Sequence, residues 1–407
     1  MQVLHINQSD ITGGAAIAVH RLHQGLLAQG IDSRLLVDIV TTSSDRVAAT
    51  PPRRRWDYQI RRLTKPLGFN DIHLTSTFEI TKHPFYQAAD VLHFHNLHSG
   101  YFNYLALPSL TKSKPAILTL HDMWSITGHC AYSFDCNRWK IGCGNCPYPD
   151  TYPPIQRDNT RLEWKLKNWA YSHSHLVGVV TTSHWLAEQA KQSMLGRFPV
   201  HHIPYSIDTQ AYQPLDPEKC RSLLGIATGK KVLMFGAQSL TNPRKGGDLL
   251  LKALSGLPDS LKSEIVLLIM GNRGEKMAES LGIPSLNLGF VSSDRLKAIA
   301  YSAADLFLFP TRADAFGLVA QEAMACATPV VSFKVGGVPD IVRPGMTGYL
   351  AQPDNALDFG TGIVQLLEDQ GLRDRLGQQS REIILEEYAL ELQSQRYLQL
   401  YEKALLY

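Results

Sequence analysis

The chain contains 407 residues, which at roughly 150 residues per domain predicts two or three domains. Hydrophobic residues make up 44% and charged residues 19%, a composition that excludes disordered, collagen-like and disulfide-dominated proteins. The net charge of +3 is too small to indicate nucleic acid as the general partner. No apolar run is long enough to span a bilayer, and the first residues lack the basic and apolar regions of a signal peptide, so we expect a cytoplasmic protein.

Strand-like and helix-like segments alternate along the first half of the chain. Residues 1–9 alternate apolar and polar side chains and run into Gly13 and Gly14, after which apolar residues recur at helical spacing up to Gly30. A strand, a glycine turn and a helix are typical of the opening of a nucleotide-binding α/β domain. Further strands are predicted over residues 33–37, 90–95, 116–120 and 176–181. This alternation favours a parallel, doubly wound sheet.

The pattern changes over residues 200–217, a polar, Pro-containing segment that we interpret as a linker. A second cycle of predicted strands then covers residues 231–236, 265–270, 287–291, 306–310 and 329–333. We therefore expect two Rossmann-like domains, residues 1–203 and 204–385, whose strand ends face each other across a ligand cleft. A final helix within residues 386–407 is expected to pack back on the first domain.

The most informative segment covers residues 314–331 and reads DAFGLVAQEAMACATPVV. A predicted strand ends shortly before it, and Gly317 is expected to open the next helix. The backbone N–H groups of Gly317, Leu318 and Val319 would then point out of the helix start, beside Phe316. Partial positive charge and N–H donors without helical partners make such a position favourable for a diphosphate.

Two carboxylates flank this helix start. Asp314 lies in the preceding loop and Glu322 within the helix, so both are expected to accept hydrogen bonds from sugar hydroxyls. A bare pair at this spacing more often reflects a helix cap and a solvent-facing Glu. The surrounding sequence resembles the E-x-F-G-L-x-x-x-E and E-A-M-A-C-G-T-P-V-V motifs of the retaining family-4 glycosyltransferases of the GT-B fold. It departs from them at Asp314, usually Glu, and at Ala327, usually Gly.

The resemblance extends along nearly the whole chain, through the first glycine loop, the interdomain HHIPYSID segment of residues 201–208 and the VGGVPD loop of residues 335–340. It implies a retaining glycosyltransferase that moves a sugar from a UDP- or GDP-linked donor to a glycan or lipid-linked acceptor, in polysaccharide or glycoconjugate biosynthesis. A catalytically silent GT-B scaffold that binds glycans or partner proteins is the alternative.

The same family supplies an Arg and a Lys to the donor diphosphate, from the loop after the first strand of its second domain. Here Lys245 aligns with that lysine, whereas the arginine is displaced to Arg244, next to it. No Asp-x-Asp occurs in the chain, so we expect catalysis without a metal.

Loops carrying Gly271-Asn272 and Phe290-Val291 are expected to contact the base, and Glu322 to hold the ribose. The expected donor-binding positions are Gly13, Gly14, Arg244, Lys245, Gly271, Asn272, Phe290, Val291, Phe316, Gly317, Leu318, Val319 and Glu322.

Histidines cluster after two predicted strands of the first domain. The resemblance implies that His121, directly after residues 116–120, contacts the donor sugar or supports the reacting centre; a turn cap is the alternative. His93 and His95 alternate along a strand and should point the same way. Either could be a metal ligand, but we favour hydrogen-bonded histidines near an acceptor pocket. The predicted catalytic residues are His121, Lys245, Asp314 and Glu322.

Four of the six cysteines fall in one predicted insertion, residues 128–150. Its last pair forms a C-x-x-C between glycines, which is typical of the tight turn in a tetrahedral thiolate site. In a reducing compartment we predict structural zinc at Cys130, Cys136, Cys143 and Cys146, with His129 as a substitute ligand. Disulfides and free thiols remain alternatives.

A basic segment runs from Arg53 to Lys65 and carries six Lys and Arg residues interleaved with Trp56, Tyr58 and Ile60. A solvated helix face explains such a pattern. The sharper hypothesis is a surface for an anionic acceptor or a membrane, because lipid-diphosphate acceptors need both charge and apolar contact. Nucleic acid is not expected as a partner.

Overall fold

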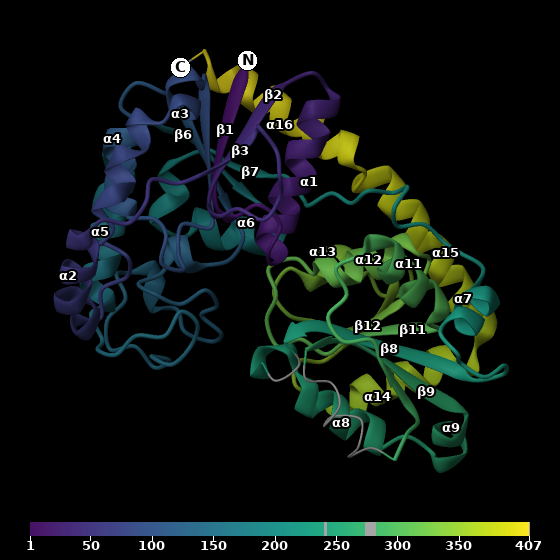
Figure 1. Ribbon diagram of the computed structural model, residues 1–407. Coiled ribbons are helices and arrows are strands. Elements are labelled where there is room, and N and C mark those ends of the chain that lie inside the picture. The colour runs from purple at the N-terminus through teal and green to yellow at the C-terminus, as the bar shows by residue number, and fades with distance from the viewer. Residues whose placement is uncertain (240–241, 273–281, 407) are drawn as a thin grey trace. The chain divides into compact units, whose positions relative to one another are not determined.

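The computed structural model describes residues 1–239, 242–272 and 282–406. The chain divides into two compact units: Met1–Pro204 with Glu391–Tyr407 form unit 1, and Tyr205–Leu390 form unit 2. Each unit contains a parallel β-sheet with helices packed against it (Figure 1). The predicted α/β class, with two Rossmann-like sheets, is therefore confirmed.

Unit 1 contains a seven-stranded sheet in the order β3-β2-β1-β4-β5-β6-β7, with every pair parallel. The order reverses between β1 and β4, where ligands usually bind in doubly wound sheets. The strands are β1 (Gln2–Ser9), β2 (Asp32–Ile39), β3 (Val47–Ala49), β4 (Val91–His95), β5 (Ala116–Leu120), β6 (Leu176–Thr181) and β7 (Val200–His202). The helices are α1 (Gly14–Ala28), α2 (Arg55–Thr64), α3 (Pro84–Ala88), α4 (Leu107–Leu110), α5 (Thr160–Ser172), α6 (His184–Lys191) and α16 (Leu390–Ala404).

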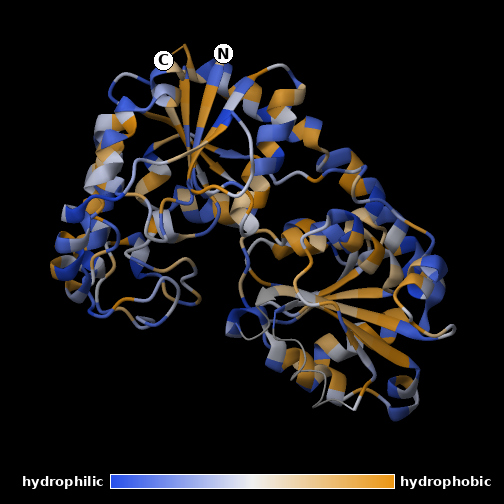
Figure 2. Ribbon diagram, in the orientation of Figure 1, coloured by the Kyte–Doolittle hydropathy of each residue, from blue (hydrophilic) through white to orange (hydrophobic). Residues whose placement is uncertain are grey.

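The C-terminal helix α16 completes the core of unit 1. Its Tyr397 and Tyr401 belong to the same buried cluster as Val3 on β1 and Leu22 on α1. Figure 2 shows the corresponding pattern, with hydrophobic strands at the centre of each unit and hydrophilic segments on the outer helices. Burial of these large aromatic side chains keeps the end of the chain attached to the first unit.

Unit 2 contains a six-stranded parallel sheet in the order β10-β9-β8-β11-β12-β13, which reverses between β8 and β11. Its strands are β8 (Lys231–Ser239), β9 (Ile265–Asn272), β10 (Ser285–Asn287), β11 (Leu306–Phe309), β12 (Val330–Phe333) and β13 (Gly348–Ala351). Its helices are α7 (Pro217–Leu223), α8 (Gly247–Ser255), α9 (Asp259–Glu264), α11 (Asp294–Ala303), α12 (Leu318–Ala325), α13 (Val338–Ile341), α14 (Ala356–Glu368) and α15 (Gln370–Glu387).

The predicted strands differ from the observed ones mainly at the sheet edges. The edge strands β3, β7 and β13 were not predicted, and β7 falls inside the segment interpreted as a linker. All three have only three or four residues, too few to show a clear alternation of apolar and polar side chains. The edge strand β10 ends at Asn287, where the predicted strand was to begin.

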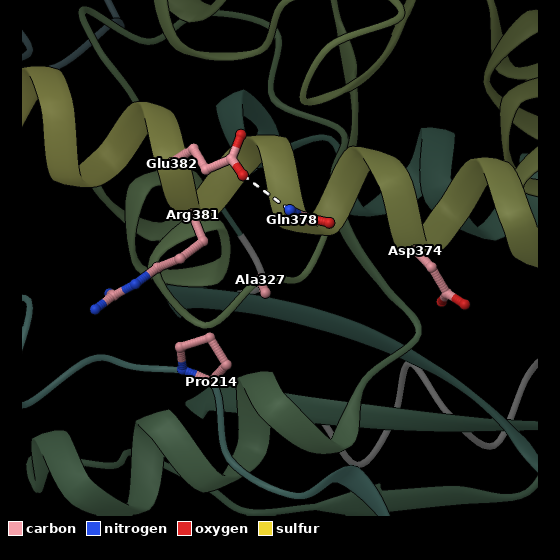
Figure 3. Close-up of a pocket in the computed structure, with 6 residues that line it drawn as sticks. All are labelled: Pro214, Ala327, Asp374, Gln378, Arg381 and Glu382. Carbon is pink, nitrogen blue, oxygen red and sulfur yellow. Dashed lines mark hydrogen bonds between the residues drawn. The ribbon is translucent and has the colours of Figure 1, made fainter.

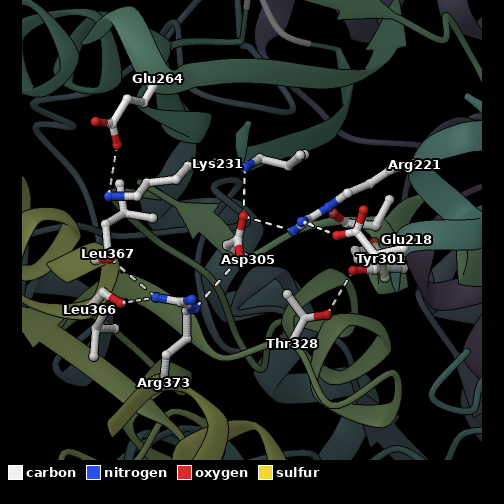
Figure 4. A network of polar contacts seen from close by, with 12 residues as sticks. Glu218, Arg221, Lys231, Glu264, Tyr301, Asp305, Thr328, Leu366, Leu367 and Arg373 are labelled. Carbon is white, nitrogen blue, oxygen red and sulfur yellow. Dashed lines mark hydrogen bonds and ion pairs between the residues drawn. The ribbon is translucent and has the colours of Figure 1, made fainter. Parts of the chain in front are cut away.

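A largely buried carboxylate connects several elements of unit 2. Asp305, at the start of β11, accepts hydrogen bonds from the backbone N–H of Val232 at 2.7 Å and from Arg221 at 2.9 Å, and Arg373 lies 3.6 Å away (Figure 4). The side chains of Arg221, Asp305 and Arg373 are only 12–14% exposed. Asp305 therefore links α7, β8 and α15 to the central strand.

We predict that Asp305→Ala lowers the free energy of unfolding by about 2 kcal/mol, because two nearly buried guanidinium groups lose the carboxylate they share and Arg221 keeps only the exposed carboxylate of Glu218. Urea unfolding followed by circular dichroism measures this loss. Asp259→Ala is the control, because Asp259 pairs with Lys262 at the surface and its side chain is 99% exposed. Equal midpoints for the two variants would contradict the structural role of Asp305.

Candidate active site

Two loops of unit 2 bring opposite charges together at the point where the strand order reverses. Lys245 follows β8, in the short 3-10 turn Pro243–Lys245, and Asp314 follows β11, the neighbouring strand. Lys245 Nζ lies 2.8 Å from Asp314 Oδ2, and Arg244 Nη1 lies 3.2 Å from the same oxygen. Two cations thus share one carboxylate, and the three side chains together carry net positive charge.

The charges of this cluster follow from burial and from one another. Burial raises the pKa of Asp314, but Lys245 and Arg244 outweigh it and bring that pKa down to about 2. Burial also lowers the pKa of Lys245 below its usual value, although Asp314 opposes this change. Asp314 is therefore ionised at neutral pH and holds both cations near the ends of β8 and β11.

The backbone fixes the two loops against each other. The N–H of Arg312 donates to the carbonyl oxygen of Arg244 at 2.8 Å, and Arg244 Nη1 donates to the carbonyl oxygen of Ala313 at 2.6 Å. Gly246 has a φ of +68°, and a Cβ there would lie 1.8 Å from the carbonyl oxygen of Pro310. Only glycine permits this close approach, so Gly246 sets the position of the neighbouring Lys245.

The helix start predicted at Gly317 is present. Gly317 has a φ of +109° and precedes α12, and Phe316 beside it is buried against the ring of Tyr205 at 5.1 Å. The first N–H groups of a helix, here those of Leu318 and Val319, have no carbonyl partner within the helix. Their place directly after the Asp314 loop adds partial positive charge to the same edge of the sheet.

The two predicted sugar-binding carboxylates have different surroundings. Glu322 is 5% exposed, and Tyr301 donates to its Oε2 at 3.2 Å. Both oxygens of Asp314 have protein partners, because Oδ1 accepts from the N–H of Phe316 at 3.3 Å. In the structure Asp314 therefore binds the two cations Lys245 and Arg244. A contact between Asp314 and a sugar hydroxyl stays a prediction.

The segments predicted to contact the base lie next to each other. Gly271, near the end of β9, donates its N–H to the carbonyl oxygen of Gly289 at 2.7 Å, and Asn272 ends the strand. Phe290 is 62% exposed, whereas Val291 is buried. Leu240 and Thr241, within the predicted phosphate loop, lie outside the described residues.

In unit 1 the structure brings together three of the predicted histidines and one that was not predicted. The rings of His93 and His95 lie 3.8 Å apart, so both point to one face of β4 as expected. His95 is hydrogen-bonded to His121 at 3.1 Å and, on its other side, to His5 of β1 at 3.1 Å. Sequence reasoning missed His5, although its spacing of two residues from Val3 places both side chains on one face of the first strand.

Other predicted positions of unit 1 lie at the same edge of the sheet. Gly13 caps α1 with a φ of +96°, and a Cβ there would have no neighbour within 4 Å. Gly14 begins the helix. His98, which follows β4 along the chain, pairs at 2.9 Å with Asp122, the residue next to His121. Gly13 therefore lies in an open turn, and a ligand at this turn stays a prediction.

The structure joins none of the four clustered cysteines in a disulfide bond. Burial raises the pKa of Cys130 to about 12 and that of Cys143 to about 11. Cys146 Sγ lies 3.2 Å from His129 Nε2. Among the described residues, the sets of three or more possible metal ligands whose atoms lie within 4.8 Å of one another include none of these cysteines. Zinc binding, which would need the thiols to turn toward one another, stays a prediction.

A hollow of about 470 Å³ lies elsewhere in unit 2 (Figure 3). It is lined by Pro214, Ala327, Asp374, Gln378, Arg381 and Glu382. Ala327 precedes β12, so the hollow lies at the amino ends of the parallel strands, opposite the edge that carries Lys245. Ala327 has a φ of +60°, a conformation that explains why family members usually have Gly there. We assign this hollow no part in donor binding.

Two family models match the sequence. "Glycosyltransferase Family 4" matches residues 12–211, and "Glycosyl transferases group 1" matches residues 219–383. Together they leave only the chain ends and a short central gap unmatched. The chain belongs to the group 1, family-4 glycosyltransferases. The family indicated by the DAFGLVAQE motif is thus confirmed.

Individual members of this glycosyltransferase family are similar over different parts of the chain. The "Putative colanic acid biosynthesis glycosyl transferase WcaC" of Escherichia coli strain K12 is 27% identical over 353 residues, 82% of this chain and 83% of that protein. A D-inositol 3-phosphate glycosyltransferase of Actinosynnema mirum is 32% identical over 189 residues, 43% of this chain. That match spans 45% of the relative, less than half of its length.

Solved structures share the complete fold. Sucrose-phosphate synthase from Thermosynechococcus elongatus matches with a TM-score of 0.73 at 19% identity, over 99% of each chain. Anabaena Alr3699/HepE, solved in complex with UDP-glucose, matches with a TM-score of 0.69 at 16% identity, over 99% of this chain and 100% of that one. These likenesses confirm that the chain has the GT-B fold.

We predict that the reduced protein binds one zinc ion per chain and that Cys143→Ser with Cys146→Ser removes it, because the C-x-x-C turn supplies two of the expected ligands. Elemental analysis of purified protein measures the metal content. Cys220→Ser is the control, because Cys220 is buried on α7 in the other unit. Reduced protein without zinc would show that the cluster consists of free thiols.

Proposed function

We propose that the protein is a retaining glycosyltransferase that moves a hexose from a UDP- or GDP-linked donor to a glycan or lipid-linked acceptor. The observation that carries the proposal is the cluster of Lys245, Arg244 and Asp314 beside the start of α12, where the strand order of unit 2 reverses. Unit 2 is assigned the nucleotide sugar and unit 1 the acceptor.

The cluster suits a diphosphate leaving group. Negative charge grows on the diphosphate as the bond to the sugar breaks, and donors already fixed in place stabilise it most effectively. Lys245 and Arg244 are held by one carboxylate, so one positive charge is left over for the ligand. The N–H groups at the start of α12 add to that charge. The phosphates would therefore lie against Lys245 and the helix start, with Glu322 holding the ribose.

The chemical step follows from this arrangement. The bond between the sugar C1 and the diphosphate oxygen breaks, and a bond from the acceptor oxygen to C1 forms on the same face of the ring. The acceptor hydroxyl gives its proton to a phosphate oxygen of the leaving group. The nucleoside diphosphate therefore departs carrying that proton. Lys245 and the helix start stabilise the departing charge, and no carboxylate-held metal is required. His121 is assigned a contact with the donor sugar.

The comparisons support a nucleotide-sugar donor. Anabaena Alr3699/HepE, which shares the fold, holds UDP-glucose in its solved structure. Family membership supports sugar transfer, and the relative named for colanic acid biosynthesis supports a polysaccharide or glycoconjugate product.

The helix α2 supports an acceptor bound to a membrane surface or carrying negative charge. Trp56 is 65% exposed and Leu63 is 72% exposed, and exposed Arg55, Arg61 and Arg62 lie on the same short helix. Exposed aromatic and basic side chains together suit the interface of an anionic lipid layer. We therefore propose peripheral contact with the inner face of a membrane through α2. No helix in the described part of the chain is long and apolar enough to cross a bilayer.

We predict that Lys245→Met weakens the binding of UDP or GDP roughly ten- to hundredfold, because it removes a charge-assisted hydrogen bond to phosphate. Isothermal titration calorimetry with each nucleotide measures the change. Lys252→Met is the matched control, because Lys252 is exposed on α8 and the substitution is the same. Equal affinities for both variants would contradict the assignment of the diphosphate site.

Turnover distinguishes the transferase from the alternative of a silent scaffold. A transferase is expected to release nucleoside diphosphate from UDP- or GDP-sugars when lipid-linked oligosaccharides are offered as acceptors. Binding of nucleotide without turnover of any of these donors would favour the scaffold.

A further inference from the structure

Three histidines of unit 1 form a hydrogen-bonded line across neighbouring strands. His5 Nδ1 of β1 lies 3.1 Å from His95 Nε2 of β4, and His95 Nδ1 lies 3.1 Å from His121 Nε2, directly after β5. Both nitrogens of His95 are therefore occupied by other imidazoles. The line begins inside the sheet and ends at the edge where the loops after β4 and β5 leave it.

The rings in this line are neutral. His5 and His95 are at most 1% exposed. Burial lowers the pKa of His5 to about 3 and that of His121 to about 4, and it lowers the pKa of His95 well below its usual value. A neutral imidazole has one N–H and one lone pair. In a line of such rings all the protons must point the same way, so only two arrangements exist.

In the first arrangement the N–H groups point outward. His5 Nδ1–H donates to His95, His95 Nδ1–H donates to His121 Nε2, and His121 carries its own proton on Nδ1. In the second arrangement every bond is reversed. His121 is then protonated at Nε2, and His5 must carry its proton on Nε2.

Two observations favour the outward arrangement. His5 Nε2 is buried and has no hydrogen-bond partner among the described residues. A buried N–H without an acceptor is rarer in proteins than an acceptor without a donor, so a lone pair at that nitrogen is the less costly choice. The negative charge of Asp122 acts to raise the pKa of His121, and the outward arrangement places the positive, N–H end of the line at His121.

We propose that His95 is a positioning residue that holds His121 in the neutral form protonated at Nδ1, and that His5 supports it as the partner of His95 Nε2. His121 then offers an N–H donor, and no added positive charge, to an oxygen of the ligand. This inference rests on the proposed function insofar as that ligand is the donor sugar. It assigns a purpose to His5 and His95, whose side chains are buried inside unit 1.

A metal at these histidines is a weaker explanation. Ligand atoms of His5, His93 and His95 do lie within 4.8 Å of one another. However, both nitrogens of His93 are already hydrogen-bonded, to Tyr401 at 2.6 Å and to Thr119 at 2.7 Å. The group contains only imidazoles, so a divalent cation would be buried without a compensating negative charge.

The protonation site of His121 can be observed directly. Histidine-selective 15N labelling and long-range proton–nitrogen spectra show which ring nitrogen carries the proton, and His121→Asn assigns the signal. We expect Nδ1–H in the wild-type protein. In His95→Phe, His121 Nε2 loses its donor, so the proton is expected to move to Nε2, the nitrogen that neutral histidine prefers in water. His5→Phe, a second variant, leaves His95 Nε2 as the buried nitrogen without a partner, so the same preference for a lone pair there predicts that His121 stays protonated at Nδ1.

Tyr401→Phe is the control, because it removes a hydroxyl bonded to His93 in the same core and leaves the line of three rings intact. It should keep the wild-type pattern of His121. A wild-type protein with His121 protonated at Nε2, or a bound metal at His5 and His95, would overturn the proposal. So would an unchanged pattern in folded His95→Phe. The spectra need no donor, so they test this proposal separately from the function.

Discussion

One carboxylate holds two cations at the position where the strand order of unit 2 reverses. Asp314 accepts from Lys245 and Arg244, and its backbone carbonyl accepts from Gly337 at 2.9 Å. Without Asp314 the two cations would repel each other at the ends of β8 and β11. With it they stay close together and leave one positive charge for an anionic ligand. The glycine at 246 and the helix start at Gly317 serve the same arrangement, because each brings backbone close to the cluster.

Unit 1 places polar groups at its own reversal of strand order by a different route. Its sheet interior contains neutral imidazoles that are hydrogen-bonded to one another. Helix α16 adds two hydroxyl groups to this network: Tyr401 bonds His93, and Tyr397 bonds Thr119, which is itself a partner of His93. A buried polar network of this kind is stable only when its members find partners. The C-terminal helix therefore closes the hydrophobic core of unit 1 and also satisfies part of the network next to His121.

Local sequence patterns predicted the central strands and the helix start at Gly317, because runs of apolar residues and a glycine between a strand and a helix leave clear signals. The edge strands of three or four residues left none. The resemblance placed Lys245 and Asp314 in one site, but spacing could not show that they contact each other, because strand order brings distant loops together. For the same reason the line from His5 through His95 to His121, drawn from three strands, was not foreseen. The cysteine spacing predicted proximity but could not fix the direction of the thiols.

A crystal structure of the protein with UDP tests the central assignment most directly. The expected result is a diphosphate in contact with Lys245 Nζ and with the N–H groups of Gly317, Leu318 and Val319. A diphosphate bound at any other place, with the contact between Lys245 and Asp314 unchanged, would contradict it.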